Sequence, residues 1–119
     1  MDQWSLLVDG RPVAEVGVAR TFAESSRGLL GRDGLDGALL FEGTSSIHTA
    51  GMRFALDVAF CDRDRRVQAV RRMRPWRLSR LRLRTRSVLE AEAGAFERWG
   101  LRRGSVLALA SPGSSGSGR

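Results

Sequence analysis

Residues 53–73 constrain the fold more than any other part of the sequence. From Arg53 to Cys61 every second residue is a large apolar one, namely Phe54, Leu56, Val58 and Phe60, and the residues between them are small or charged. Alternation with a period of two is typical of a β-strand with two unlike faces. The polar run Asp62-Arg63-Asp64-Arg65 follows as a turn, and residues 67–73 return as a second strand. The sequence therefore predicts a β-hairpin here.

Other short apolar runs, each bounded by turn residues, extend this pattern along the chain. Asp9-Gly10 indicates a second hairpin, because both positions tolerate positive φ. Helices are expected after Thr21, which forms a capping box with Glu24, and at residues 94–99 before Gly100. Further strands are expected at residues 5–8, 13–19, 38–41, 87–93 and 106–110. About seven strands and two short helices predict a mainly β (α+β) fold, a small, mostly antiparallel β-sandwich or barrel.

The chain of 119 residues is expected to form one domain over residues 1–110, followed by a disordered Ser/Gly-rich tail at 111–119. Its single cysteine, Cys61, excludes an internal disulfide and is expected to be buried in an apolar strand. The first residues lack the basic start of a signal peptide, and no apolar run approaches about 20 residues. We therefore expect a cytoplasmic protein that does not span a membrane.

The net charge is +7, and all twenty basic residues are arginine. Lys, Asn and Tyr are absent and Ile47 is the only isoleucine, which is the signature of a GC-rich genome and explains part of the arginine excess without a ligand. Eight arginines and Trp76 lie between Arg71 and Arg86. Arginine with an interleaved aromatic suits phosphate contacts and base stacking, but alternating Leu and Arg equally fits an edge strand. The candidate polyanion-binding residues are Arg74, Arg77, Arg80, Arg82 and Arg84.

The second candidate site surrounds His48, the only histidine. An imidazole oriented by Asp57 suits a general base or a ligand contact. A structural role fits the same residues, with Thr49 satisfying backbone groups and Asp57 pairing with Arg53 or capping a turn. Glu90 and Glu92 share one face of an expected strand, facing either a site or solvent. Without paired histidines or cysteines, we expect neither a metal nor a cofactor.

An ordered set of short motifs resembles the family of uncharacterised proteins called DUF192, over about residues 13–110. The motifs are Arg27-Gly28-Leu29-Leu30-Gly31-Arg32, Gly37-Ala38-Leu39-Leu40-Phe41, His48-Thr49-Ala50-Gly51-Met52-Arg53 with Asp57 and Phe60, and Val88-Leu89-Glu90 with Ala93-Gly94. The resemblance implies a compact β-structure of the sandwich or jelly-roll kind and no established activity.

Two departures limit what the resemblance carries over. Many members read Trp-Met-x-Asn-Thr before the aspartate, whereas this chain has His48-Thr49 and Gly51-Met52, as in actinobacterial-type members, and Ala55 replaces a common proline. A role of that Trp or Asn does not transfer. The family pattern supports candidate ligand-binding residues at His48, Thr49, Met52, Asp57 and Glu90. Arg53, which follows Met52 in the sequence, is a further candidate.

Three functions follow as expectations. The first is a non-enzymatic accessory module that binds a ligand or protein partner at the face of His48, Asp57 and Glu90. The second is an enzyme acting on a small polar substrate with His48 as general base. The third is a nucleic-acid-associated protein working through the basic segment from Arg71 to Arg86, with nonspecific polyanion contact as its weaker form.

Overall fold

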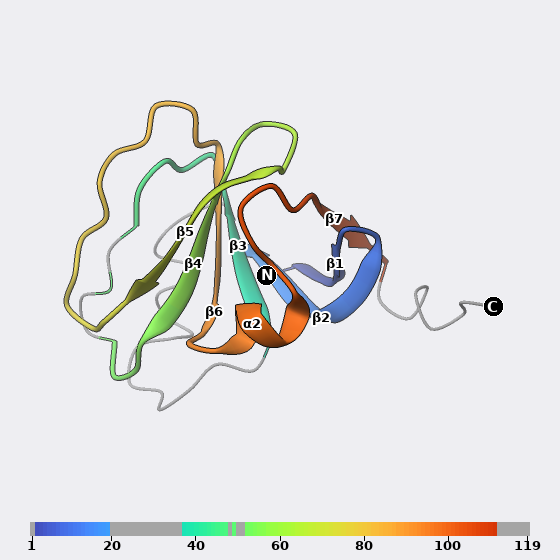
Figure 1. Cartoon of the computed structure of the whole chain (residues 1–119), viewed down its shortest axis with the longest axis horizontal. Coiled ribbons are helices and arrows are strands. Elements are labelled where there is room, and N and C mark those ends of the chain that lie inside the picture. The colour runs from blue at the N-terminus through green and yellow to red at the C-terminus, as the bar shows by residue number, and fades with distance from the viewer. Residues whose placement is uncertain (1, 20–36, 48, 50–51, 112–119) are drawn as a thin grey trace.

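The computed structural model describes residues 2–19, 37–47, 49 and 52–111. The strands are β1 (Asp2–Val8), β2 (Arg11–Ala19), β3 (Ala38–Glu42), β4 (Leu56–Cys61), β5 (Val67–Met73), β6 (Ser87–Glu92) and β7 (Leu107–Ala110), and the helix is α2 (Ala95–Trp99). The seven strands form one sheet in the order β5-β4-β6-β3-β2-β1-β7 (Figure 1). The mainly β fold class is confirmed, with one curled sheet in place of a two-sheet sandwich.

Both predicted hairpins are confirmed. Asp9 and Gly10 have φ of 50° and 84° between β1 and β2, as the Asp-Gly signal requires. At the β4–β5 turn, Oδ1 of Asp62 accepts hydrogen bonds from the amides of Asp64 (2.9 Å) and Arg66 (3.0 Å). Residues 67–73 form β5 as expected, while β4 begins at Leu56 and not at residue 53.

One parallel pair, β2 with β3, interrupts an otherwise antiparallel sheet. Gly37 leads into β3 with φ of 76°, and a Cβ there would lie 2.5 Å from the Glu15 carbonyl oxygen. Only glycine fits both demands. The sheet curls so far that its two edge strands approach each other: Arg66 and Val106 form a bridge, and the Leu107 amide donates to the Arg65 carbonyl at 2.9 Å. The result is a half-barrel (Figure 1).

The central strands β3, β4 and β6 are buried on both faces. Inside the curl, Ala59 and Cys61 pack in a cluster with Leu6, Leu40 and Phe96. On the other face a second cluster contains Leu56, Val58, Phe60, Met52 and Met73. The predicted alternation along β4 is therefore confirmed, and so is the burial of Cys61.

Residues 74–86 join β5 to β6 without forming a strand, as a loop that we call the arginine loop. The edge-strand alternative for residues 78–86 is therefore wrong. Several backbone hydrogen bonds tie this segment to residues 45–49, among them Ser79 N to Ile47 O (2.8 Å) and Arg82 N to Ser45 O (3.2 Å). The leucines that an edge strand would have packed are exposed.

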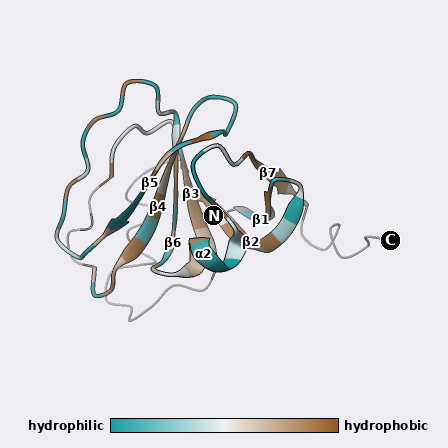
Figure 2. Cartoon of the chain, in the orientation of Figure 1, coloured by the Kyte–Doolittle hydropathy of each residue, from teal (hydrophilic) through white to brown (hydrophobic). Residues whose placement is uncertain are grey.

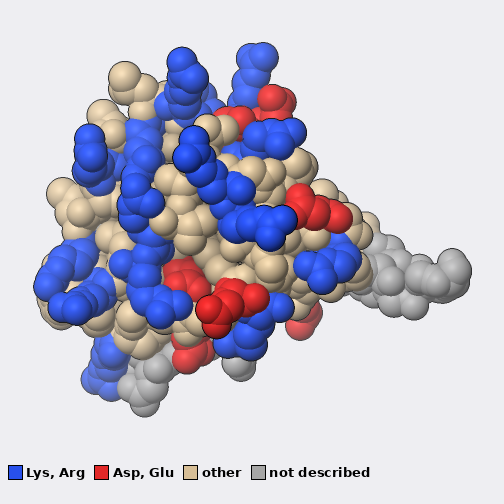
Figure 3. Space-filling model, in the orientation of Figure 1, with Lys and Arg blue, Asp and Glu red and all other residues tan. Residues whose placement is uncertain are grey.

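Of the two expected helices, α2 is confirmed, with Gly100 as its C-cap at φ of 68°. The helix expected after Thr21 and the tail expected at residues 111–119 lie outside the described residues, apart from Ser111. Within the described residues, no helix has the length and hydrophobicity that a bilayer crossing requires. Arginine side chains cover much of the face shown in Figure 3, over β5 and the arginine loop.

Candidate anion-binding site

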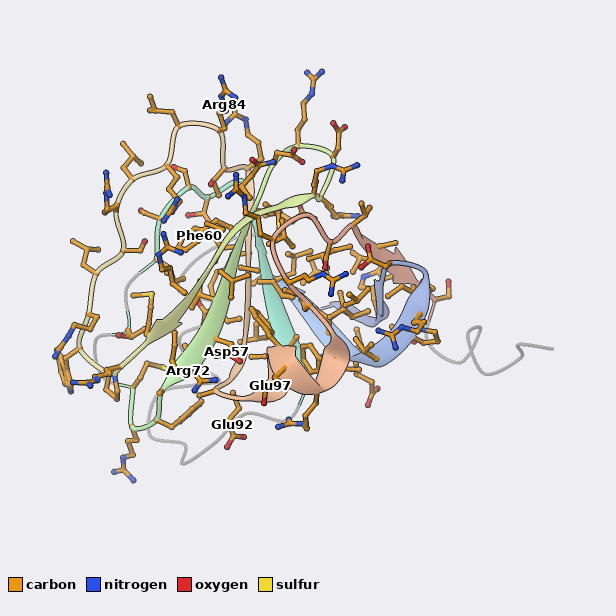
Figure 4. The ribbon with its side chains drawn as sticks, in the orientation of Figure 1. Asp57, Phe60, Arg72, Arg84, Glu92 and Glu97 are labelled. Carbon is orange, nitrogen blue, oxygen red and sulfur yellow. The ribbon has the colours of Figure 1, made fainter. Side chains whose placement is uncertain are left out.

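Asp57 is fully engaged in holding α2 against β4 (Figure 4). Its carboxylate is buried, and Oδ2 accepts hydrogen bonds from the amides of Gly94 (2.8 Å) and Phe96 (3.2 Å). Oδ1 accepts a bond from Arg72 Nε at 3.0 Å, and this ion pair replaces the pairing with Arg53 that we expected as one alternative. Capping a turn, the other structural alternative for Asp57, describes its environment.

Glu90 lies on the opposite face of the sheet from Asp57. In the register of β4 and β6, Glu90 pairs with Val58 whereas Asp57 pairs with Ala91, and cross-strand partners share a face. Glu90 is buried at 2% exposure beside the second cluster, and this burial raises the pKa of its carboxyl to about 8. The geometry therefore does not bring Asp57 and Glu90 into one concavity, and His48 lies outside the described residues.

Thr49 joins two loops through both its backbone and its hydroxyl. Its Oγ1 donates to the Arg74 carbonyl (2.7 Å) and accepts from the Arg77 amide (2.8 Å). Its carbonyl accepts from the Trp76 amide at 2.9 Å. Thr49 is fully buried, Met52 packs in the second cluster, and Arg53 is exposed. The structural alternative for Thr49, satisfying backbone groups, is what the geometry shows.

The candidate arginines of the basic segment do come together, around a hollow of about 420 Å³ beside β5. We call this hollow the arginine pocket. Its lining includes Arg71, Arg72, Arg74, Arg77, Arg80 and Arg82. Met73, Leu78 and Ser79 complete the wall above Phe60, and none of the described lining residues is a carboxylate. Arg84, the fifth candidate, does not belong to the lining.

Arg82 is the most constrained of these side chains. Its guanidinium lies over the Phe60 ring, with Cζ 4.7 Å from the centroid, and its Nε is buried with no hydrogen-bond partner. Burial, and then the positive charges of Arg71 and Arg80, lower its pKa. Within the described residues only Arg72 of the six makes an ion pair with a carboxylate. The pocket therefore holds uncompensated positive charge.

A second hollow beside the β4–β5 turn has the opposite character. Carboxylates of Glu42, Asp62 and Asp64 share its lining with arginines, and Arg65 pairs with Glu42 at 2.6 Å. Such internal compensation gives no preference for an anion.

Burial raises the pKa of the Cys61 thiol to about 12, so this thiol stays protonated at neutral pH. Among the described residues no three His, Cys, Asp or Glu side chains are grouped to hold a metal ion.

Sequence reasoning included Arg71 and Arg72 in the basic segment but did not name them as binding residues. Both belong to the lining of the arginine pocket, although the Arg72 guanidinium is paired with Asp57. The other four lining arginines, Arg74, Arg77, Arg80 and Arg82, were identified from the run of arginines in the sequence.

The fold and the site define a small single-sheet β-domain with a basic hollow at one edge of the sheet. The chain belongs to the family DUF192, described as "uncharacterized ACR", whose model matches residues 5–109. The resemblance drawn from its motifs is therefore confirmed.

Two solved structures share the fold. A protein from Sinorhizobium meliloti, described as a "putative transcription regulator", is 22% identical, with 91% of this chain and 94% of that chain covered and a TM-score of 0.75. A protein of unknown function from Novosphingobium aromaticivorans is 25% identical, with 89% of this chain and 82% of that chain covered and a TM-score of 0.71. None of the curated proteins is significantly similar to this chain.

Proposed function

We propose that this protein is a non-enzymatic binding module that holds an organic anion in the arginine pocket. The observation that carries the proposal is the lining of one hollow of about 420 Å³: among the described residues it has six arginines, of which only Arg72 is paired with a carboxylate, and no Asp or Glu. Protein surfaces normally intersperse charges of both signs, and the second hollow does so. Guanidinium groups bind carboxylate and phosphate through paired hydrogen bonds, which gives such a pocket a defined ligand chemistry.

The apolar residues in the wall narrow this chemistry. Met73 and Leu78 line the pocket between the arginines, so the ligand combines an anionic group with an apolar portion. The buried Nε of Arg82 offers an unused donor beside this mixed surface. An inorganic anion would interact with the arginines alone and would leave the apolar wall without a contact.

The other expected site ranks lower because its described residues already have structural partners. The Thr49 hydroxyl bonds to backbone groups, and the Asp57 carboxylate bonds to two backbone amides and to the Arg72 side chain. The general-base role proposed for His48 has no described residue that supports it, which leaves an enzyme as the weaker hypothesis.

Nucleic acid is the second candidate ligand, favoured by one observation. Trp76 is 69% exposed among the arginines, and an exposed indole suits base stacking. The description of the Sinorhizobium protein as a "putative transcription regulator" points the same way, although at 22% identity that likeness concerns the fold.

Calorimetric titration at low salt tests the anion proposal with two probes, inorganic phosphate and 1-naphthyl phosphate. We expect 1-naphthyl phosphate to bind more tightly, because only it can use the apolar wall. Arg77→Gln and Arg80→Gln should each weaken binding by about ten- to a hundredfold, since a hydrogen bond to a charged group is worth about 1.5–3 kcal/mol.

Arg84→Gln is the matched control, because it removes one arginine from the same loop outside the pocket lining. Its affinity should stay within about twofold of the unmodified chain, the effect of one distant screened charge. Equal losses in all three variants would show diffuse charge attraction without a site. Failure of both probes to bind would overturn the proposal.

A further inference from the structure

The most exposed large apolar side chains of the described residues all belong to the arginine loop. Leu83 is 83% exposed, Leu78 77%, Trp76 69% and Leu81 67%, while the next, Val106, is only 37% exposed. Figure 2 shows apolar and polar positions alternating along this outer loop. Soluble surfaces rarely gather such residues without a partner.

The apolar side chains are held outward by a braced backbone. Thr49 bonds to Trp76 and Arg77, and Ile47 exchanges bonds with Ser79 through the Ser79 hydroxyl and amide, both at 2.8 Å. Trp76 adopts φ of 62°, an uncommon value for a bulky residue that its neighbours must enforce. The leucines therefore cannot fold back onto the core without breaking these bonds.

Charge selects the partner. From residue 71 to 86 the sequence contains eight arginines and no Asp or Glu. A second copy of the chain would bring two such segments together, and their repulsion opposes a dimer through this face. The partner must offer negative charge and an apolar interior within the same few ångströms.

We propose that the arginine loop docks this protein onto an anionic lipid surface, with the pocket taking the headgroup phosphate. Leu78, Leu81, Leu83 and Trp76 would enter the boundary between headgroups and acyl chains, while arginines bind phosphates around them. Leu78 both lines the pocket and is exposed, so an anion in the pocket lies next to an inserting side chain. This inference rests on the proposed anion-binding function and names the source of the anion.

Nucleic acid fits the same surface less well. It supplies phosphates for the arginines and bases for Trp76, but it offers no apolar environment to three exposed leucines. A lipid surface accounts for both kinds of side chain.

Vesicle sedimentation tests the proposal with the full chain and vesicles of phosphatidylglycerol and phosphatidylcholine. Binding is expected to vesicles containing phosphatidylglycerol and not to pure phosphatidylcholine. The triple variant Leu78→Ser, Leu81→Ser, Leu83→Ser should lose more than about tenfold in vesicle affinity, because the apolar contribution is removed. These leucines are exposed, so folding should be retained.

A double variant, titrated with 1-naphthyl phosphate as well as with vesicles, separates the two proposals. Leu81→Ser, Leu83→Ser keeps every pocket residue and should bind the soluble phosphate normally while binding vesicles more weakly. Normal phosphate binding with no vesicle binding would overturn docking and leave the pocket function standing. If the unmodified chain binds neither 1-naphthyl phosphate nor vesicles, both the pocket function and lipid docking would be overturned.

Trp76 gives a direct measure of insertion depth. Phosphatidylglycerol lipids with brominated acyl chains should quench its fluorescence, and Trp76→Phe should remove most of the quenching, because Trp4 and Trp99 are half-buried away from the loop. Vesicle binding that the leucine variants leave unchanged would overturn lipid docking, because it would show adsorption by charge alone. If lipids do not quench Trp76 and a single-stranded oligonucleotide displaces the vesicles completely, the surface would be assigned to nucleic acid.

Discussion

Glu90 is the residue whose surroundings differ most from those that an ionised side chain prefers. It is 2% exposed, and burial raises its pKa from 4.5 to about 8. Below the lower value the carboxyl is protonated in both folded and unfolded chains. Between the two values the folded chain holds a proton that the unfolded chain releases, so stability falls as pH rises. Above pH 8 both states are ionised and the full cost of burial remains.

We predict that Glu90→Gln stabilises the protein by an amount that grows between about pH 5 and 8. The gain should reach a few kcal/mol, because one pKa unit corresponds to about 1.4 kcal/mol. Urea unfolding at several pH values measures it as the difference from the unmodified chain, which cancels other titrating groups. A constant difference across this range would contradict the raised pKa.

At the residue scale, the sequence identified Glu90 as noteworthy but could not show its environment. Alternation along residues 87–93 fits an outward-facing glutamate equally well, because the pattern does not reveal what covers a face. Glu92, on the same face, is exposed. Only the packing around the strand makes the environment of Glu90 buried and that of Glu92 exposed.

At the scale of elements, Asp57 fastens α2 to the sheet. The helix has five residues, and Gly94 at its N-cap provides no side-chain cap. The carboxylate of Asp57 supplies the missing acceptor from a different strand. Its long sequence separation from α2 explains why a sequence pattern could suggest turn capping without naming the helix.

We predict that Asp57→Ala lowers the free energy of unfolding by about 2–4 kcal/mol, because two amides lose their acceptor in a buried site. Arg72→Ala should cost less than about 1 kcal/mol, because the Arg72 side chain is 61% exposed and its ion pair is screened. Chemical denaturation of both variants measures the contrast. Equal costs would mean that the ion pair, and not the helix cap, is what Asp57 provides.

The arginine loop shows the limit of local pattern at the same scale. Leu and Arg alternate over residues 78–86, which fits a strand with one apolar face. The structure instead braces this segment against residues 45–49 and leaves both kinds of side chain exposed. The partners of a loop are set by distant residues, which no window of the sequence contains.

At the scale of the whole molecule, the strands are unequally protected from solvent. β4 and β6 each have a neighbouring strand on both sides and are buried on both faces, whereas β5 and β7 end the sheet order. The bridge between Arg66 and Val106 ties these two edges at one point. Stability should therefore decline from the centre of the sheet outward.

We predict that amide hydrogen exchange is slowest in β4 and β6 and faster in β7. Within the arginine loop, the amides of Trp76, Arg77 and Ser79 should exchange more slowly than those of Leu81 and Leu83, because the first three donate to residues 47 and 49. Exchange measured by NMR or mass spectrometry checks both orders. Uniformly fast exchange across the loop would remove the bracing on which lipid docking depends.

The sequence by itself determined the mainly β class, both hairpins, the helix before Gly100, the two-faced packing of β4 and the family. These features depend on local turn chemistry and on alternation, which act over a few residues. The tertiary structure decided that the sheet curls into a half-barrel, that Asp57 and Glu90 face opposite sides, and that six arginines surround one hollow. Those outcomes depend on strand order and on contacts between distant segments, and a linear pattern does not encode either one.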